Sequence, residues 1–155
     1  MALIEQKLLG LIEAQCVIDG VIAECKRVNH PALAIVVVDK HAEVVAWVRM
    51  DGRSSRFGKA AHRKAYSAAL FERDTDGIIT FWARQELEGH RGPADWGDPM
   101  LTTLPGGYVV RYEGDIVGAI GIAGGASGDA NTPPSDRYFA EVAVRSLGEG
   151  YTHSA

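Results

Sequence analysis

Hydrophobic residues recur at three- and four-residue spacing from residue 3 to residue 28, which predicts a long amphipathic helix. This helix should end at Asn29-His30-Pro31, because the residue before a proline is disfavoured in helical geometry. The apolar stripe of the predicted helix consists of Ile4, Leu8, Leu11, Ile18, Val21, Ile22, Cys25 and Val28.

Two pairs of apolar runs predict antiparallel hairpins. Residues 33–39 form a near-continuous apolar run, and residues 43–50 follow it after a short turn. Residues 108–112 and 116–123 repeat this arrangement around a turn at 113–115.

Three further helices are expected between and after the hairpins. The first is capped by Ser54 or Ser55 and runs to about Glu72, and a shorter one starts near Asp74. The last is capped by Ser135 or Asp136 and runs through 147, after which a polar tail from 148 should fray. The order α-β-β-α-α-β-β-α shows no βαβ crossover, so we expect an α+β fold with an antiparallel sheet.

Glycines interrupt the last apolar run in an unusual way. Four glycines lie between 118 and 125, and the pair Gly106-Gly107 precedes the hairpin. Glycine weakens a strand, so the backbone here should come close either to another layer of the protein or to a ligand. Residues 89–105, rich in glycine and proline, read as a long irregular loop, and such loops are often functional.

Composition narrows the class of protein. A chain of 155 residues with 46% hydrophobic and 23% charged residues is typical of one soluble domain. The net charge of −4 argues against nucleic-acid binding. Cys16 and Cys25 would lie roughly 13 Å apart on one helix, so we expect free thiols. No signal-like or membrane-length apolar run is present, and we expect a cytoplasmic protein with no membrane partner.

Several side chains could carry chemistry. Asp51 lies where a strand ends and could accept hydrogen bonds from a ligand or from its own turn. Lys64 is unusual in an alanine-rich helix; it either reaches to solvent at the rim or stabilises charge in a pocket. Among five histidines, His62 and His90 are the best ligand candidates. No paired histidine or cysteine spacing predicts a metal site, whereas a single axial haem ligand needs no local pattern.

Four stretches together resemble the GlcG/HbpS family, a haem-binding or haem-degrading domain that also occurs as the C-terminal domain of some PduO-type adenosyltransferases. They are Ile35-Val36-Val37-Val38-Asp39, Arg49-Met50-Asp51-Gly52, Lys64-Ala65-Tyr66-Ser67-Ala68, and the hairpin from Gly106-Gly107 to Gly124-Gly125 with Asp129. The resemblance implies a profilin-like three-layer α/β/α sandwich with a five-stranded antiparallel sheet, commonly oligomeric. It covers a core of residues 3–147 in a single domain of residues 1–155, with 148–155 as a tail, and the fifth strand is expected near Met100 to Leu104.

The chain departs from the family pattern at three places. Tyr108 replaces a proline after the first glycine pair, and Ala123 replaces a serine before the second. The loop that contains His90, Trp96 and Asp98 has no family counterpart. The family's ligand residues therefore cannot be transferred directly.

Three functions are compatible with these observations. The first is a binding protein for a small planar or aromatic ligand, haem being possible, held between the glycine pairs and the 49–51 turn. The second is an isomerase, cyclase or hydratase acting on a small oxygenated metabolite, with Asp51 or Asp129 as base and Lys64 or Arg49 stabilising charge. The third is a homo-oligomeric scaffold without a ligand. The predicted ligand-binding residues are Arg49, Met50, His62, Tyr66, His90, Trp96, Gly106, Gly107, Gly124 and Gly125.

Overall fold

A computed structural model describes residues 2–85, 96–125 and 135–153 of the chain. Within these residues a five-stranded antiparallel sheet is combined with four α-helices and one 3₁₀ turn. In chain order the elements are α1 (Leu11–Arg27), β1 (Ala34–Asp39), β2 (Val44–Arg49), α2 (Ser55–Phe71), the 3₁₀ turn η1 (Thr75–Gly77), α3 (Ile78–Gln85), β3 (Gly107–Tyr112), β4 (Asp115–Ala123), α4 (Asp136–Arg145) and β5 (Tyr151–Thr152).

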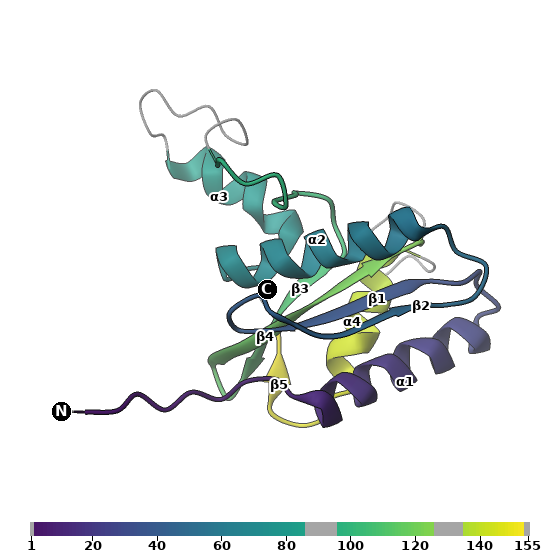
Figure 1. Cartoon of the computed structure of the whole chain (residues 1–155), viewed down its shortest axis with the longest axis horizontal. Coiled ribbons are helices and arrows are strands. Elements are labelled where there is room, and N and C mark those ends of the chain that lie inside the picture. The colour runs from purple at the N-terminus through teal and green to yellow at the C-terminus, as the bar shows by residue number, and fades with distance from the viewer. Residues whose placement is uncertain (1, 86–95, 126–134, 154–155) are drawn as a thin grey trace.

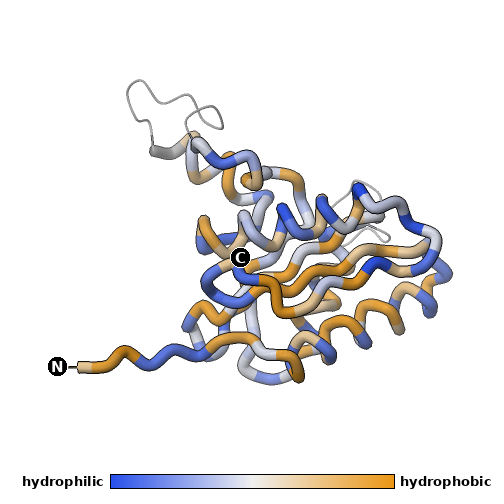
Figure 2. The backbone as a smooth tube through the Cα atoms, viewed as in Figure 1, coloured by the Kyte–Doolittle hydropathy of each residue, from blue (hydrophilic) through white to orange (hydrophobic). Residues whose placement is uncertain are grey.

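The sheet lies between two helical layers, as the sequence predicts. Its strand order is β2-β1-β4-β3-β5, and every neighbouring pair is antiparallel. Helix α2 covers one face, while α1 and α4 cover the other (Figure 1). Side chains of β1 alternate accordingly: Ile35 and Val37 join the core under α1 and α4, and Val36 and Val38 join the core under α2. The apolar positions gather on these central strands (Figure 2).

Helix α1 begins at Leu11, so the expected start at residue 3 is wrong. The backbone N–H of Leu9 donates to the carbonyl of Val117 at 2.9 Å, which fixes the preceding segment beside β4 in a non-helical path. The Glu13 carboxylate then accepts from the N–H of Gly10 at 3.1 Å and caps the new helix start. Upstream of this point Leu3 and Ile4 are 87% and 86% exposed, and the segment extends away from the body (Figure 1).

The fifth strand is β5 at the C-terminal end, and the expected strand near residues 100–104 is absent from the described structure. Thr152 pairs with Arg111 and Tyr151 pairs with Tyr112. The prediction that the segment after residue 148 frays is therefore wrong for residues 151–153, because the ring of His153 also stacks on Tyr108 at 4.2 Å.

Both cysteines are free thiols, Cys16 exposed and Cys25 buried, as predicted. In the described part of the chain no helix is both long and apolar enough to span a membrane.

Candidate functional site

A pocket of about 310 Å³ opens where the first half of α2 meets the end of β4 and the start of α4. Its lining combines apolar side chains with an arginine, a lysine, an aspartate and a pair of glycines. The lining residues are Arg56, Phe57, Ala60, Lys64, Leu104, Ala123, Gly124, Gly125 and Asp136.

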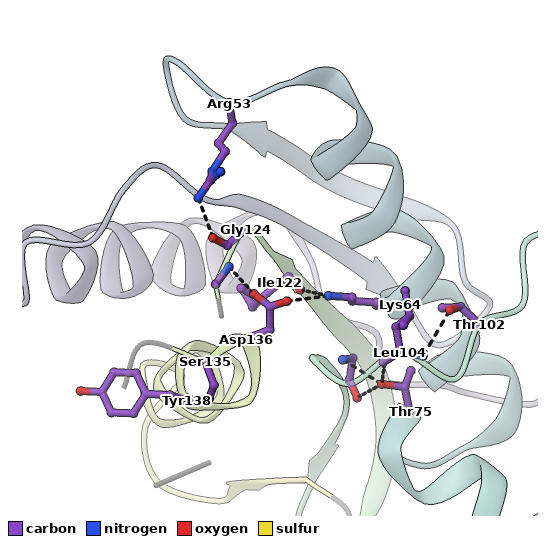
Figure 3. A network of polar contacts seen from close by, with 12 residues as sticks. Arg53, Lys64, Thr75, Thr102, Leu104, Ile122, Gly124, Ser135, Asp136 and Tyr138 are labelled. Carbon is purple, nitrogen blue, oxygen red and sulfur yellow. Dashed lines mark hydrogen bonds and ion pairs between the residues drawn. The ribbon is translucent and has the colours of Figure 1, made fainter. Parts of the chain in front are cut away.

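An ion pair between Lys64 and Asp136 forms the polar end of this pocket (Figure 3). The Lys64 ammonium donates to Oδ2 of Asp136 and to the carbonyl of Ile122, both at 2.8 Å. The other carboxylate oxygen of Asp136 accepts from the N–H of Gly125 at 2.6 Å. Lys64 is only 4% exposed, so the interpretation of a lysine reaching to solvent at the rim is wrong.

The start of α4 positions Asp136. Ser135 is the N-cap, since its hydroxyl accepts from the N–H of Tyr138 at 3.0 Å, and Asp136 is then the first helical residue. Sequence reasoning treated Asp136 only as a possible cap and missed it as a site residue. The pairing with Lys64 joins residues 72 positions apart, and no local pattern signals it.

Gly106 allows this ion pair to approach the sheet. Its φ of +110° favours glycine, and a Cβ there would lie 2.8 Å from Cβ of Asp136 and 3.3 Å from the ammonium of Lys64. Any larger residue would press on both partners of the pair. Gly106, predicted to bind a ligand, is not among the lining residues and instead approaches the two partners of the ion pair.

Arg53 fixes the end of β4 beside the pocket. Its guanidinium donates to the carbonyl of Gly124 at 2.6 Å (Figure 3). It also donates to the carbonyl of Ala32 at 2.5 Å. Gly124 has φ +114°, which only glycine adopts readily, and its backbone turns there toward Gly125. Arg53 thereby holds the backbone that presents the Gly125 N–H to Asp136.

The described part of the expected long loop, residues 96–105, is held against α2. The hydroxyl of Tyr66 donates to Asp98 at 2.6 Å, and the N–H of Thr102 donates to Ser67 at 2.8 Å. Burial and the Asp98 carboxylate raise the pKa of Tyr66, with the hydrogen bond to Asp98 as the main cause. The hydroxyl of Thr75 donates to the carbonyl of Leu104 at 2.7 Å, which places Leu104 at the pocket.

The structure separates the other predicted site residues from the pocket. Arg49 and Asp51 are exposed and do not line it. Met50 is half-buried and accepts a hydrogen bond from the N–H of Leu33. Trp96 packs on Phe71, with ring centroids 5.2 Å apart. Asp129 and His90 lie outside the described residues.

His62 lies in a separate row of aromatic side chains, on the side of α2 that faces away from the pocket. Its ring is 5.2 Å from that of Trp47 and 6.3 Å from that of Tyr66, measured between centroids. Burial lowers the pKa of this imidazole. The predicted site therefore divides into a pocket that contains Lys64, Gly124 and Gly125, and a half-buried face that contains His62 and Tyr66.

The three-layer sandwich matches known structures along nearly its whole length. The crystal structure of Klebsiella pneumoniae protein ORFY has a TM-score of 0.77 at 23% identity and covers 96% of this chain and 97% of that one. HbpS has a TM-score of 0.77 at 24% identity, covering 95% of each chain. The PduOC:haem complex has a TM-score of 0.74 at 16% identity, covering 96% of this chain and 99% of that one.

Sequence comparison identifies the family. The model for haem degrading protein HbpS-like matches residues 9–132. Protein GlcG of Escherichia coli K12 is 32% identical to this chain over 95 residues. These residues make up 61% of this chain and 66% of GlcG, so the match spans just under two thirds of the relative's length. The chain belongs to the HbpS-like family, which confirms the resemblance seen in the sequence.

Proposed function

We propose that this protein binds a small molecule in the pocket between α2, β4 and α4. The observation that carries this proposal is the Lys64–Asp136 ion pair, which is withdrawn from solvent and yet lines a cavity. Burying two charges costs several kcal/mol per ion, and such pairs add little stability compared with apolar residues of similar size. An ion pair retained at the end of a pocket is better explained by recognition of a ligand than by folding.

The lining favours a ligand with a flat apolar body and one polar end. Phe57, Ala60 and Leu104 form the apolar wall, and Lys64 and Asp136 form the polar end. A volume of about 310 Å³ is at the lower end of the range of small-molecule sites. The pocket thus suits a small aromatic compound, or one edge of a larger planar molecule.

Haem is the ligand that the family description and the PduOC:haem complex suggest. Haem iron is held by histidine, cysteine, methionine or tyrosine, and the described lining residues include none of these. Lys64 is already paired with Asp136. An iron-ligated haem therefore does not fit this pocket as described. The described residue best suited to ligate iron is His62, whose partly buried imidazole lies outside the pocket.

Binding accounts for the geometry better than acid–base catalysis does. A general base needs a carboxylate oxygen free to take a proton from the substrate. Both oxygens of Asp136 accept hydrogen bonds from the protein, and Asp51 is exposed away from the pocket. The proposed base Asp129 is outside the described residues.

A variant that fills the pocket tests the proposal. Ala60→Phe places a ring in the cavity, and Lys59→Phe places the same ring on the neighbouring exposed position of α2 as a matched control. A panel of small aromatic compounds is screened by ligand-observed NMR against the three proteins. We expect compounds that bind the wild type and Lys59→Phe and lose binding in Ala60→Phe. If no compound binds the wild type, or if those that bind are unaffected by Ala60→Phe, the pocket is not the binding site.

Haem is tested in parallel by titration with hemin and measurement of the Soret band. A band that is lost in His62→Ala and kept in Ala60→Phe assigns haem to the His62 face. A band that is lost in Ala60→Phe alone contradicts the assignment of iron ligation outside the pocket.

A further inference from the structure

Four acceptor oxygens at the polar end of the pocket each already accept a hydrogen bond from the protein. The carbonyl of Ile122 accepts from Lys64, and the carbonyl of Gly124 accepts from Arg53. Both carboxylate oxygens of Asp136 accept as well, from Lys64 and from Gly125. Each of these oxygens has a further lone pair, so the acceptors alone do not decide the class of ligand, and the donors and charges of the lining must be considered.

Donors at the same end remain available. An ammonium group has three hydrogens, and within the described residues Lys64 uses two of them. The guanidinium of Arg56 lies over the ring of Phe57, 4.6 Å from its centroid, and makes no side-chain hydrogen bond within the described part of the chain. The polar end of the pocket thus presents two cationic groups that can still donate hydrogen bonds.

The charges of the lining indicate which kind of ligand these donors would bind. Two cations, Lys64 and Arg56, face one carboxylate, that of Asp136. Because Asp136 is held by Lys64 and by the Gly125 amide, it neutralises one positive charge and leaves the other uncompensated among the described lining residues. A ligand that brings one negative charge would complete the site, and charge-assisted hydrogen bonds are the strong ones in such settings.

We propose that the ligand of this pocket is a small acid with an aromatic body, whose carboxylate binds Lys64 and Arg56. The aromatic body lies against Phe57, Ala60 and Leu104. Arg56 already stacks on Phe57, so its fork is oriented by the ring and loses little freedom when it binds a carboxylate. This inference rests on the proposed binding function and adds the chemical class of the ligand.

Two kinds of ligand carry such a carboxylate: a free aromatic acid, and a tetrapyrrole that enters the pocket by the edge bearing its propionates. Benzoate and benzamide are matched probes for the first kind, because they differ in charge at nearly the same size. Protoporphyrin IX and its dimethyl ester are matched probes for the second, since esterification removes both acids and the absence of iron removes ligation by His62.

The test measures the affinity of each probe by NMR or fluorescence titration for the wild type, Arg56→Gln and Lys59→Gln. Arg56 and Lys59 are both exposed, so neither substitution should unfold the protein. In at least one of the two probe pairs, we expect the acid to bind about tenfold tighter than its neutral analogue. This ratio is in line with the strength of a charged hydrogen bond. Arg56→Gln should remove most of that preference, and Lys59→Gln should keep it.

The outcomes separate the two proposals. Equal binding of acid and neutral probes to the wild type, lost in Ala60→Phe, overturns the acid assignment and leaves ligand binding in place. An acid preference that persists in Arg56→Gln also overturns the assignment, because the carboxylate would then be bound by a group other than Arg56. Failure of every probe and of the wider aromatic panel to bind the wild type overturns the proposed function itself. A preference confined to the porphyrin pair assigns the tetrapyrrole, and one confined to benzoate assigns a free acid.

Discussion

Gly107 of β3 and Gly121 of β4 lie opposite each other in the sheet, and helix α2 rests directly on both. A Cβ on Gly107 would lie 2.4 Å from the carbonyl oxygen of Lys64, and one on Gly121 would lie 1.9 Å from that of Ala61. The helix backbone thus occupies the space that two side chains would fill. This close approach brings Lys64 near enough to β4 for its ammonium to reach the carbonyl of Ile122.

Replacing Gly121 by alanine should destabilise the fold. The added methyl group meets backbone atoms of α2, which cannot move aside without lifting the helix from the sheet. Overpacking of this kind costs about 1–3 kcal/mol, and contact with backbone places Gly121→Ala at the upper end. Urea unfolding measures the loss. Gly77→Ala is the control, because a Cβ there meets nothing within 4 Å and should change stability little.

The ion pair of the pocket should show strong coupling between its partners. Asp136→Asn leaves the buried ammonium of Lys64 without its counter-charge and should cost about 3 kcal/mol. Lys64→Met keeps an apolar stem in place and leaves Asp136 with the Gly125 amide, so its cost should be smaller. In the double variant neither charge is buried alone, and its cost should fall below the sum of the two single costs. Additive costs in a urea-unfolding cycle would contradict the coupling.

Local patterns were sufficient for strands β1 to β4 and for α2. Strand β1 is a near-continuous apolar run because both of its faces are buried, Ile35 and Val37 in one core and Val36 and Val38 in the other. Local patterns also indicated that the glycines permit a close approach. Which group approaches them depends on contacts between distant segments. Lys64 meets Asp136 across 72 positions, and neither residue's neighbourhood encodes the other.

Strand β5 and the start of α1 were not predicted correctly, for different reasons. Strand β5 has two residues, Tyr151 and Thr152, too few to show any periodicity. The start of α1 was misplaced because Leu3 and Ile4 continue the apolar pattern, although they bury nothing. The backbone bond from Leu9 to Val117 decides where the helix begins, and hydrophobic spacing carries no information about such a bond.

The C-terminal segment should depend on His153. Its Nδ1 lies 2.7 Å from Asp74, its Nε2 lies 2.8 Å from Glu141, and its ring stacks on Tyr108. With only two residues paired in β5, these contacts supply much of the docking. His153→Ala should therefore speed amide exchange in residues 150–152 by at least about tenfold, as expected for local opening eased by roughly 1.4 kcal/mol. His41→Ala, at an exposed turn, should leave that exchange unchanged, and equal exchange in both variants would show that β5 docks without His153.

Contact between α1 and α4 should make stability sensitive to acid. Hydrogen bonds from Arg27 and from the hydroxyl of Tyr138 lower the pKa of Glu24 to about 2, from an ordinary value of 4.5. Since the pKa of the folded state is depressed, the stability that these contacts provide is complete above pH 4.5 and is lost as the pH falls toward 2. Tyr138→Phe removes one donor and should raise the pKa of Glu24 toward 4.5. The stability difference between wild type and Tyr138→Phe, measured by urea unfolding, should be constant from pH 7 to about 5.5 and should shrink between pH 4.5 and 2.5.

Tyr151→Phe is the matched control for this titration. Burial raises the pKa of Tyr151, so its hydroxyl stays neutral throughout the acid range. Its ring packs on Tyr112 with centroids 4.8 Å apart, and phenylalanine keeps that contact. The stability difference between wild type and Tyr151→Phe should therefore not vary between pH 7 and 2.5. If the Tyr138→Phe difference is equally flat, Glu24 does not link α1 to α4 through a charged hydrogen bond, and the two helices are held by their apolar contacts alone.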